Sequence, residues 1–447
     1  MNNKQHHPPT EGADAGRRAV IVGAGQAGVS VAEKLRANGF KGTVTLVGDE
    51  PHAPYQRPPL SKAYLLGQVE RQRLKLKAED WYAKNMIELR IDVRVDSIDR
   101  QQRHIRLAEG SALPYDDLVL TTGAIPRQLP KAISCGLSGV FTVRSLSDID
   151  ALRPVFQSSG KLLVIGGGYI GLEIAAVARS RGLAVEVVET ADRILPRVAC
   201  TETAYEIEAL HRSKGVKFHF GVSVDKLLGA DHVTAARLAN GKIIQANVVV
   251  AGIGALPNSA LAQRAGLAVD DGIVVDACGR TDDPSIWAAG DCANFCLLSG
   301  SLRLESVGNA IDSADLVARN IMGAQQPYQP TPWFWSDQFD LKLQIAGLSR
   351  PSDRVVVRKG SGPGRSHWYY REGKLVAVDG LNAPRDYLIG KRLMAMSASP
   401  PPADLADGDI ALEALAKGAD EIKPAASHTD NILPVRAKTA RTEAIST

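Results

Sequence analysis

The hydrophobic pattern of the chain contains the same unit twice. Each copy begins with an apolar run, continues through a glycine turn into apolar residues at helical spacing, and ends in a second apolar run. This order is typical of a buried parallel strand, its crossover helix and the next strand. We predict one unit over 17–50, with its helix ending near Gly39, and a second over 161–190, with its helix ending at Gly182.

Further apolar runs extend this pattern. Stretches that end in glycine predict additional strands within 115–124, 248–259 and 285–293. Near 325–340 prolines and tryptophans cluster; short runs with Gly or charged turns then predict antiparallel strands, followed by a helix over 385–396. The predicted fold class is α/β, with two Rossmann-like dinucleotide-binding domains and a C-terminal α+β domain.

The composition is that of a globular protein, with 45% hydrophobic and 23% charged residues among 447. A formal charge of +4 without a Lys/Arg run argues against nucleic acid binding. The first residues lack the apolar core of a signal peptide, and the longest apolar run contains glycines and Glu173, so we expect neither export nor a membrane span. The five cysteines form no C-x-x-C pair and the histidines show no helical metal spacing, which predicts a cytoplasmic protein without a metal site.

The first glycine turn has the G-x-G-x-x-G spacing of a dinucleotide cradle, at Gly23, Gly25 and Gly28. The first glycine permits the tight turn, the second lets a pyrophosphate approach the backbone, and the third lets the helix pack on the strand. An acid about 20 residues further on is expected to bind ribose. That acid is Asp49, with Glu50 beside it. Because glycine occupies position 48, where the acid usually falls, the position of the ribose-binding acid stays open by one residue.

The second turn repeats the spacing at Gly166, Gly168 and Gly171, and Glu189 closes the following strand. A carboxylate at that place accepts hydrogen bonds from ribose hydroxyls and repels a 2′-phosphate, so NADH is favoured over NADPH, although Arg193 lies close by. Two cradles in one chain predict one resident and one exchanging dinucleotide. A flavin and a nicotinamide suit this division, because hydride passes directly between their stacked rings.

Eight motifs in order make the chain resemble the NADH-dependent ferredoxin reductases of oxygenase systems, within the FAD-dependent pyridine nucleotide-disulfide oxidoreductase superfamily. They lie within residues 17–396 and are VIVGAGQAG, PPLSKAYL, LVLTTGAIPR, VIGGGYIGLE, VVVAGIGALPN, WAAGDCA, ESVGNA and WFWSDQFDLKLQIAGL. The resemblance implies bound FAD, NADH as a substrate, and transient contact with a small [2Fe–2S] ferredoxin that feeds a Rieske dioxygenase or a cytochrome P450.

The resemblance also implies a glutathione-reductase-like division of the chain, in which the NAD-binding domain is inserted into the FAD-binding domain. The expected parts are a disordered arm (1–16), the FAD-binding domain (17–125 and 251–327), the NAD-binding domain (126–250), a C-terminal interface domain (331–398), and a linker with a mostly disordered tail (399–447), the linker itself being expected at 399–409.

Site residues follow from the resemblance, position by position. Lys62 and Glu173 are expected to pair beside the flavin, tuning it and placing the nicotinamide. The FAD contacts are expected at Gly23, Gly25, Ala27, Gly28, Asp49, Arg57, Lys62, Val95, Arg144, Asp291, Val307 and Trp335. The NAD contacts are expected at Gly166, Gly168, Tyr169, Ile170, Gly171, Glu173, Glu189 and Gly254.

Two tryptophans and two cysteines are interpreted as packing residues. Trp333 and Trp335 are favoured as core residues of the C-terminal domain, with Trp335 the nearer to the flavin. Cys292 and Cys296 are interpreted as small buried residues.

Residues 51–68, where disulfide reductases of this group carry redox cysteines, contain none. Reduced flavin is therefore expected to pass its electrons to an external acceptor. A helix over 308–322 carries Asp312 and Asp315 facing outward together with Arg319, so a simple basic docking patch is not predicted. Two alternatives stay open: a quinone or radical reductase without a protein partner, and an NADH-sensing flavoprotein resembling apoptosis-inducing factor, although no long insertion is seen in 331–400.

Overall fold

The computed structural model describes residues 16–157, 160–359 and 364–420. Its first unit is built on a five-stranded parallel sheet with the order β19-β7-β1-β2-β3, so strands from both sides of the second unit share one sheet. The strands are β1 (Arg18–Val22), β2 (Thr43–Val47), β3 (Ile87–Arg90), β7 (Asp117–Leu120) and β19 (Ile286–Ala288).

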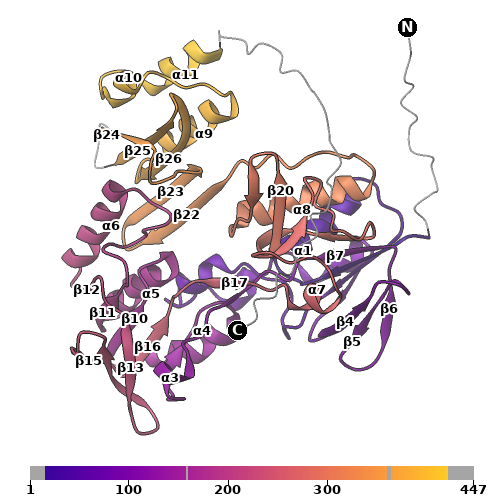
Figure 1. Cartoon of the computed structure of the whole chain (residues 1–447), viewed down its shortest axis with the longest axis horizontal. Helices are drawn as coiled ribbons and strands as arrows, with labels where there is room; N and C mark the ends of the chain where they lie inside the picture. Colours follow the sequence, from indigo (N-terminus) through magenta and orange to yellow (C-terminus); the bar gives the residue numbers. More distant parts are fainter. Residues whose placement is uncertain (1–15, 158–159, 360–363, 421–447) are drawn as a thin grey trace, which may run out of the picture.

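Helices α1 (Gln26–Ala37) and α8 (Val307–Ile321) pack side by side against this sheet, as Figure 1 shows. The apolar faces of both helices are buried with the strand side chains in one core. α1 ends before Gly39, which adopts a φ of +89°, a backbone conformation that favours glycine.

Shorter elements cover the rest of the first unit. An antiparallel meander, β4-β5-β6, packs with β18, β20 and α7 around a second core. The elements are β4 (Val95–Asp99), β5 (His104–Leu107), β6 (Ala112–Pro114), β18 (Ile273–Val275), β20 (Ala293–Leu297), β21 (Gly300–Leu302), α2 (Glu79–Lys84), α7 (Ala260–Arg264), and the short 3₁₀ helices η1 (Pro58–Ser61), η2 (Arg71–Leu74) and η4 (Gly290–Cys292).

The second unit repeats the architecture with the parallel order β12-β11-β10-β16-β9 and an antiparallel β13-β14-β15 meander. The chain enters and leaves this unit through β8 (Ala124–Pro126) and β17 (Ala255–Pro257), which pair antiparallel. The other elements are β9 (Val140–Phe141), β10 (Lys161–Ile165), β11 (Ala184–Val188), β12 (Lys217–His219), β13 (Val224–Gly229), β14 (Val233–Leu238), β15 (Ile243–Gln245), β16 (Val248–Ala251), α3 (Lys131–Ser134), α4 (Leu146–Leu152), η3 (Arg153–Gln157), α5 (Tyr169–Ser180) and α6 (Thr201–Ser213).

The C-terminal domain is an antiparallel sheet with the order β22-β23-β26-β25-β24, and helices gather beside it at the upper left of Figure 1. β22 and β25 both contact the second unit, so this domain closes over α5 and α6. Its elements are β22 (Trp333–Gln338), β23 (Leu341–Gly347), β24 (Arg354–Lys359), β25 (Arg365–Arg371), β26 (Lys374–Leu381), α9 (Pro384–Ala395), α10 (Pro402–Ala406) and α11 (Leu412–Asp420).

The proline-rich segment 399–409, expected to be a linker, instead carries α10 and packs on the C-terminal domain. Leu405 is fully buried, and Leu412 at the start of α11 is 4% exposed. The guanidinium of Arg358 on β24 donates to the backbone carbonyls of Leu405, Asp407, Gly408 and Ile410. Two buried leucines and a strand arginine distant in sequence thus hold a stretch whose composition indicates a linker. Residues 1–15 of the expected arm and residues 421–447 of the expected tail lie outside the described residues.

We predict that Arg358→Met releases this segment. Methionine fills a similar volume but leaves four carbonyls without their donor, so the free energy of unfolding should fall by about 2–3 kcal/mol. Limited proteolysis should then cut between 402 and 420, where the wild-type protein resists. Arg354→Met, at the exposed start of the same strand, is the matched control and should keep wild-type resistance. Equal resistance in both variants would contradict the interpretation.

None of the helices in the described part of the chain combines the length and the apolar character that crossing a membrane requires.

Candidate functional site

The first glycine turn leaves room for a ligand only at its second glycine. Gly23 has a φ of +111°, and a Cβ there would lie 2.2 Å from the Thr121 carbonyl oxygen. A Cβ on Gly28 would lie 2.0 Å from the carbonyl oxygen of Gly23. At Gly25 a Cβ would meet no atom of the described residues within 4 Å, and none of their side chains caps the start of α1. The uncapped N–H groups therefore face space that fits a pyrophosphate.

The second turn has the same construction. Gly166 has a φ of +107°, and a Cβ there would lie 2.4 Å from the Gly252 carbonyl oxygen, while a Cβ on Gly171 would lie 2.3 Å from the Gly166 oxygen. Gly168 again faces open space, and α5 again begins without a side-chain cap. Both cradles therefore fit a dinucleotide by steric criteria that are independent of the motif.

The acidic residues that follow the two units differ in exposure and in hydrogen bonding. Asp49 is exposed, whereas Glu50 is half-buried and accepts hydrogen bonds from Arg57, at 2.5 Å, and from the hydroxyl of Tyr55. A Cβ on Gly48 would lie 2.5 Å from that of Ala24 in the first turn, so no acid fits at position 48.

Glu189 lies at the second cradle itself. Its Oε2 accepts the Gly167 backbone N–H at 2.7 Å, and its other oxygen accepts from Ala191 N–H. The neighbouring Arg193 donates only inward in the contacts seen, to the carbonyls of residues 194, 195, 196 and 199. Its guanidinium is therefore engaged with backbone rather than directed at a phosphate.

Lys62 and Glu173 form the charged centre of the site. The Lys62 Nζ lies 2.7 Å from Glu173 Oε1, and the two side chains are 16% and 4% exposed. Ser336 Oγ donates to Oε1 at 2.6 Å and Ser61 Oγ donates to Oε2 at 2.5 Å. Burial raises the pKa of Glu173, while Lys62 and the two hydroxyls oppose that rise by stabilising the carboxylate.

A cavity of about 600 Å³ opens beside this pair, between η1, α5, α8 and β22. Its lining includes Lys62, Glu173, Trp335 and Val307, the first residue of α8. A helix N-terminus carries a partial positive charge, so α8 favours an anionic group in the cavity. The two tryptophans are half-buried and stacked at 5.5 Å, not core residues as predicted; Trp335 reaches the cavity because β22 runs along its edge.

A second charged group connects the first unit to the start of α4. Arg144 lies 3.1 Å from Asp291, and Arg57 donates to the Arg144 carbonyl oxygen. Burial raises the pKa of Asp291, and Arg144 opposes that rise. Gly290, with a φ of +77°, brings the Asp291 turn so close to α1 that a Cβ would lie 2.8 Å from that of Ala27. This small-residue contact positions Asp291 near the first cradle.

The other predicted positions are spread more widely. Val95 begins the β4 meander and is 9% exposed, whereas Ile170 on the first turn of α5 is 44% exposed. Tyr169 points its ring at Phe334 of the C-terminal domain, 4.4 Å between centroids, and its buried hydroxyl has no hydrogen-bond partner in the part of the chain that the structure describes. Gly254 has a φ of +101° near the arginines at 127 and 197. Tyr169 thus contacts the C-terminal domain, while Ile170 reaches the solvent beside the second cradle.

Sequence reasoning missed the serines that hold Glu173, and Glu50 as the partner of Arg57. Ser61 adjoins Lys62 within one motif, a signal that could have been used. Ser336 lies 163 residues from Glu173, and no local pattern relates the two. Two other expectations fail. Asp315 pairs with Lys34 and Arg319 instead of facing outward. Cys292 is buried as expected, but Cys296 is exposed because β20 leaves it at the surface. Asp312 is likewise half-buried.

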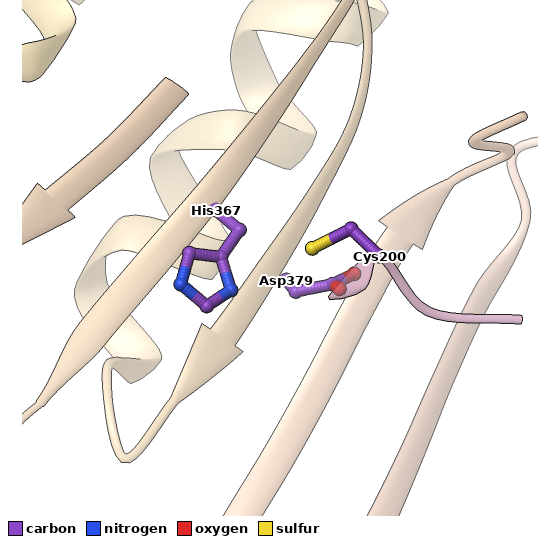
Figure 2. Close-up of side chains that lie close together, drawn as sticks. All are labelled: Cys200, His367 and Asp379. Carbon is purple, nitrogen blue, oxygen red and sulfur yellow. The ribbon is translucent and has the colours of Figure 1, made fainter. Parts of the chain in front are cut away.

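Another polar cluster lies where α6 meets the C-terminal sheet. Figure 2 shows Cys200, His367 and Asp379 converging. The Thr203 hydroxyl occupies their midst, 2.6 Å from His367 Nδ1 and 2.8 Å from Asp379 Oδ2. Burial raises the pKa of Asp379 to about 7. With a hydroxyl already bonded at its centre, the cluster is a hydrogen-bonded contact between the two domains.

Comparisons with known proteins agree over most of the chain. The family described as pyridine nucleotide-disulphide oxidoreductase matches residues 17–314, and the reductase C-terminal family matches 333–416. Rhodocoxin reductase from Rhodococcus erythropolis is 40% identical over 92% of this chain and 97% of its own length.

Two solved structures are similar to the whole fold. A ferredoxin reductase for the CYP199A2 system from Rhodopseudomonas palustris has a TM-score of 0.87 and 40% identity, covering 90% of this chain and all of that one. The reductase in the covalent putidaredoxin reductase–putidaredoxin complex has a TM-score of 0.87 and 38% identity, covering 91% and 99%.

Proposed function

The chain belongs to the pyridine nucleotide-disulphide oxidoreductase family, and from that premise we propose that it is an NADH-dependent ferredoxin reductase. FAD would be resident at the first cradle and NADH would exchange at the second. When bound, the two dinucleotides supply hydride transfer and single-electron release. The observation that carries the proposal is the buried Lys62–Glu173 pair, which lines one cavity from both units.

The protein's own residues bind and orient. The uncapped starts of α1 and α5 offer backbone N–H groups to the two pyrophosphates, and Glu189 offers a carboxylate to a ribose. Arg57, Arg144 and Asp291 supply charged groups of both signs beside the first cradle. Lys62 and Glu173 together add no net charge, so they present a directed dipole to the cavity.

Electrons must leave the protein through an external acceptor. The segment 51–68 has no cysteine, and the five cysteines, all within the described residues, are free. The relatives' names include rhodocoxin reductase and a ferredoxin–NAD(P)+ reductase, and the covalent complex holds a reductase together with putidaredoxin. We propose a [2Fe–2S] ferredoxin that supplies an oxygenase, docking transiently near Trp335, as electron-transfer encounters do over small interfaces.

Anaerobic mixing of the purified yellow protein with NADH tests the proposal. The visible flavin absorbance should be lost rapidly and return when an oxidised [2Fe–2S] ferredoxin is added. Turnover with a quinone alone, without any response to ferredoxin, would contradict the ferredoxin assignment. Slow loss of absorbance and a lasting charge-transfer band would instead identify an NADH sensor. A colourless protein would contradict the proposal as a whole.

We predict that Glu189→Arg changes the preferred dinucleotide. The variant loses the acceptor for ribose hydroxyls and gains a cation for a 2′-phosphate, so the KM for NADH should rise about tenfold while NADPH improves. Steady-state kinetics with both dinucleotides measure the change. Glu189→Gln keeps an acceptor for Gly167 N–H and controls for the loop geometry. An unchanged preference in Glu189→Arg would place the ribose elsewhere.

We also propose a cytoplasmic location, supported by the five free cysteines, because thiols stay reduced there. Fractionation of the native source with antibody detection tests this, and recovery from an oxidising compartment would contradict it.

A further inference from the structure

Glu173 is the end of a buried hydrogen-bonded relay that begins on a different domain. Ser336 donates to Glu173, Gln338 Nε2 donates to Ser336 Oγ at 3.0 Å, and Gln338 Oε1 contacts His211 Nε2 at 2.8 Å. Ser336 and Gln338 share one face of β22, being two residues apart, and His211 lies on α6. Glu173, Ser336, Gln338 and His211 are all 3% exposed or less.

Chemistry fixes the direction of this relay. An ionised carboxylate only accepts hydrogen bonds, so Ser336 must give its one proton to Glu173. Its oxygen then accepts from the amide NH₂ of Gln338, which leaves the Gln338 carbonyl oxygen to accept from His211 Nε2–H. Every donor in the series therefore points toward Glu173, and the arrangement favours the charged form of that residue.

His211 is suited to the start of such a relay because it stays neutral. Its ring is packed edge-on against Phe339 and Phe218, at 5.0 and 6.1 Å between centroids. Burial lowers the pKa of His211 to about 4, so near neutral pH it carries one proton. That proton is on Nε2, because Nε2 faces the carbonyl oxygen of Gln338, whereas the buried Nδ1 has no partner among the described residues. The imidazole is thus a fixed donor.

We propose that His211, Gln338 and Ser336 are positioning residues that hold Glu173 ionised and aligned with Lys62 beside the cavity. This inference rests on the proposed function, since the pair is what faces the bound rings. Under this proposal α6 and the C-terminal domain help to tune the site, although Lys62 and Glu173 both lie outside them. Besides Lys62 and Ser61, the groups near Glu173 are Tyr169 on α5 and Asp337, which lines the same cavity.

The test uses the holoenzyme and two readouts that a purely structural role would not move. In Ser336→Ala the carboxylate loses one charged hydrogen bond, so the pH midpoint for flavin reduction by NADH should rise by about one unit, a tenfold change in the ionisation equilibrium. Near that midpoint, loss of the negative charge should also stabilise reduced flavin. The equilibrium constant for reduction of the flavin by a reference dye should rise by up to about tenfold, which is about 30 mV in the potential of a two-electron couple.

Conservative and distant variants complete the design. Ser336→Thr keeps the hydroxyl and should retain both wild-type values. His211→Leu breaks the relay far from the cavity and should shift both in the direction of Ser336→Ala, by less. If Ser336→Ala is yellow and reducible but keeps the wild-type midpoint and dye equilibrium, the inference is wrong while the proposed function stands. If NADH fails to reduce the wild-type protein, the proposed function itself has failed.

Discussion

Gly168→Val should raise the KM for NADH by at least about tenfold, equivalent to about 1.4 kcal/mol of binding, while the protein folds and keeps its flavin. The position has a φ of −80° and a ψ of 176°, an extended conformation that valine adopts without strain. Among the described residues, a Cβ there meets no protein atom within 4 Å. We therefore expect valine to obstruct a ligand at the start of α5. Steady-state kinetics and the ratio of flavin to protein absorbance measure the two expectations.

The same substitution in the first cradle is the matched control. Gly25 also faces open space, with a φ of −88°, so Gly25→Val should fold but lose its flavin. Each variant thus impairs one dinucleotide and spares the other. Loss of flavin from Gly168→Val, or a normal KM for NADH in that variant, would contradict the assignment of the two cradles.

The parts of the fold that depend on short-range pattern could be predicted from the sequence. Continuous apolar runs before Gly23 and Gly166 predicted the two parallel sheets, and the relatives and the structure confirm this fold class. The same reasoning failed at residues 399–409, because three successive prolines are typical of a linker. What folds that segment is Arg358, some 47–52 residues earlier on another element.

The charged pair itself came from family resemblance, not from spacing. Glu173 lies on α5 and Lys62 follows η1, and no periodicity relates two positions in separate units. The relay was out of reach for the same reason: His211 and Gln338 are 127 residues apart, and each alone is an ordinary helix or strand residue. Only packing of the C-terminal sheet against α5 and α6 brings them together.

Lys62→Met should both destabilise the protein and slow flavin reduction about a hundredfold or more, which corresponds to roughly 2.7 kcal/mol. Removing the cation leaves Glu173, 4% exposed, as a buried carboxylate without a counter-charge. Breaking such a pair from one side costs about 3 kcal/mol or more. Denaturant unfolding and anaerobic stopped-flow reduction by NADH measure the two effects.

The stability loss should depend on pH with a definite sign. Burial already raises the pKa of Glu173 above its ordinary value of 4.5, and losing Lys62 raises it further. The folded variant then binds a proton more tightly than the unfolded chain does. Stability should therefore fall as the pH rises from about 4.5 through the raised pKa, and the deficit of Lys62→Met should be smallest in acid.

A double variant separates stability from function. Lys62→Met/Glu173→Gln removes both charges, and its amide accepts from one of the two serines through its oxygen while donating to the hydroxyl oxygen of the other through its NH₂. Most of the lost stability should therefore return, as it does when buried ion pairs are replaced by neutral groups. Flavin reduction should stay slow, because the dipole beside the cavity is gone. Lys75→Met, which breaks an exposed pair with Glu79, should change neither property. If Lys62→Met is as stable and as rapidly reduced as the wild type, the pair has no part in the reaction, since no other lysine or arginine among the described residues lines this cavity to replace the lost cation.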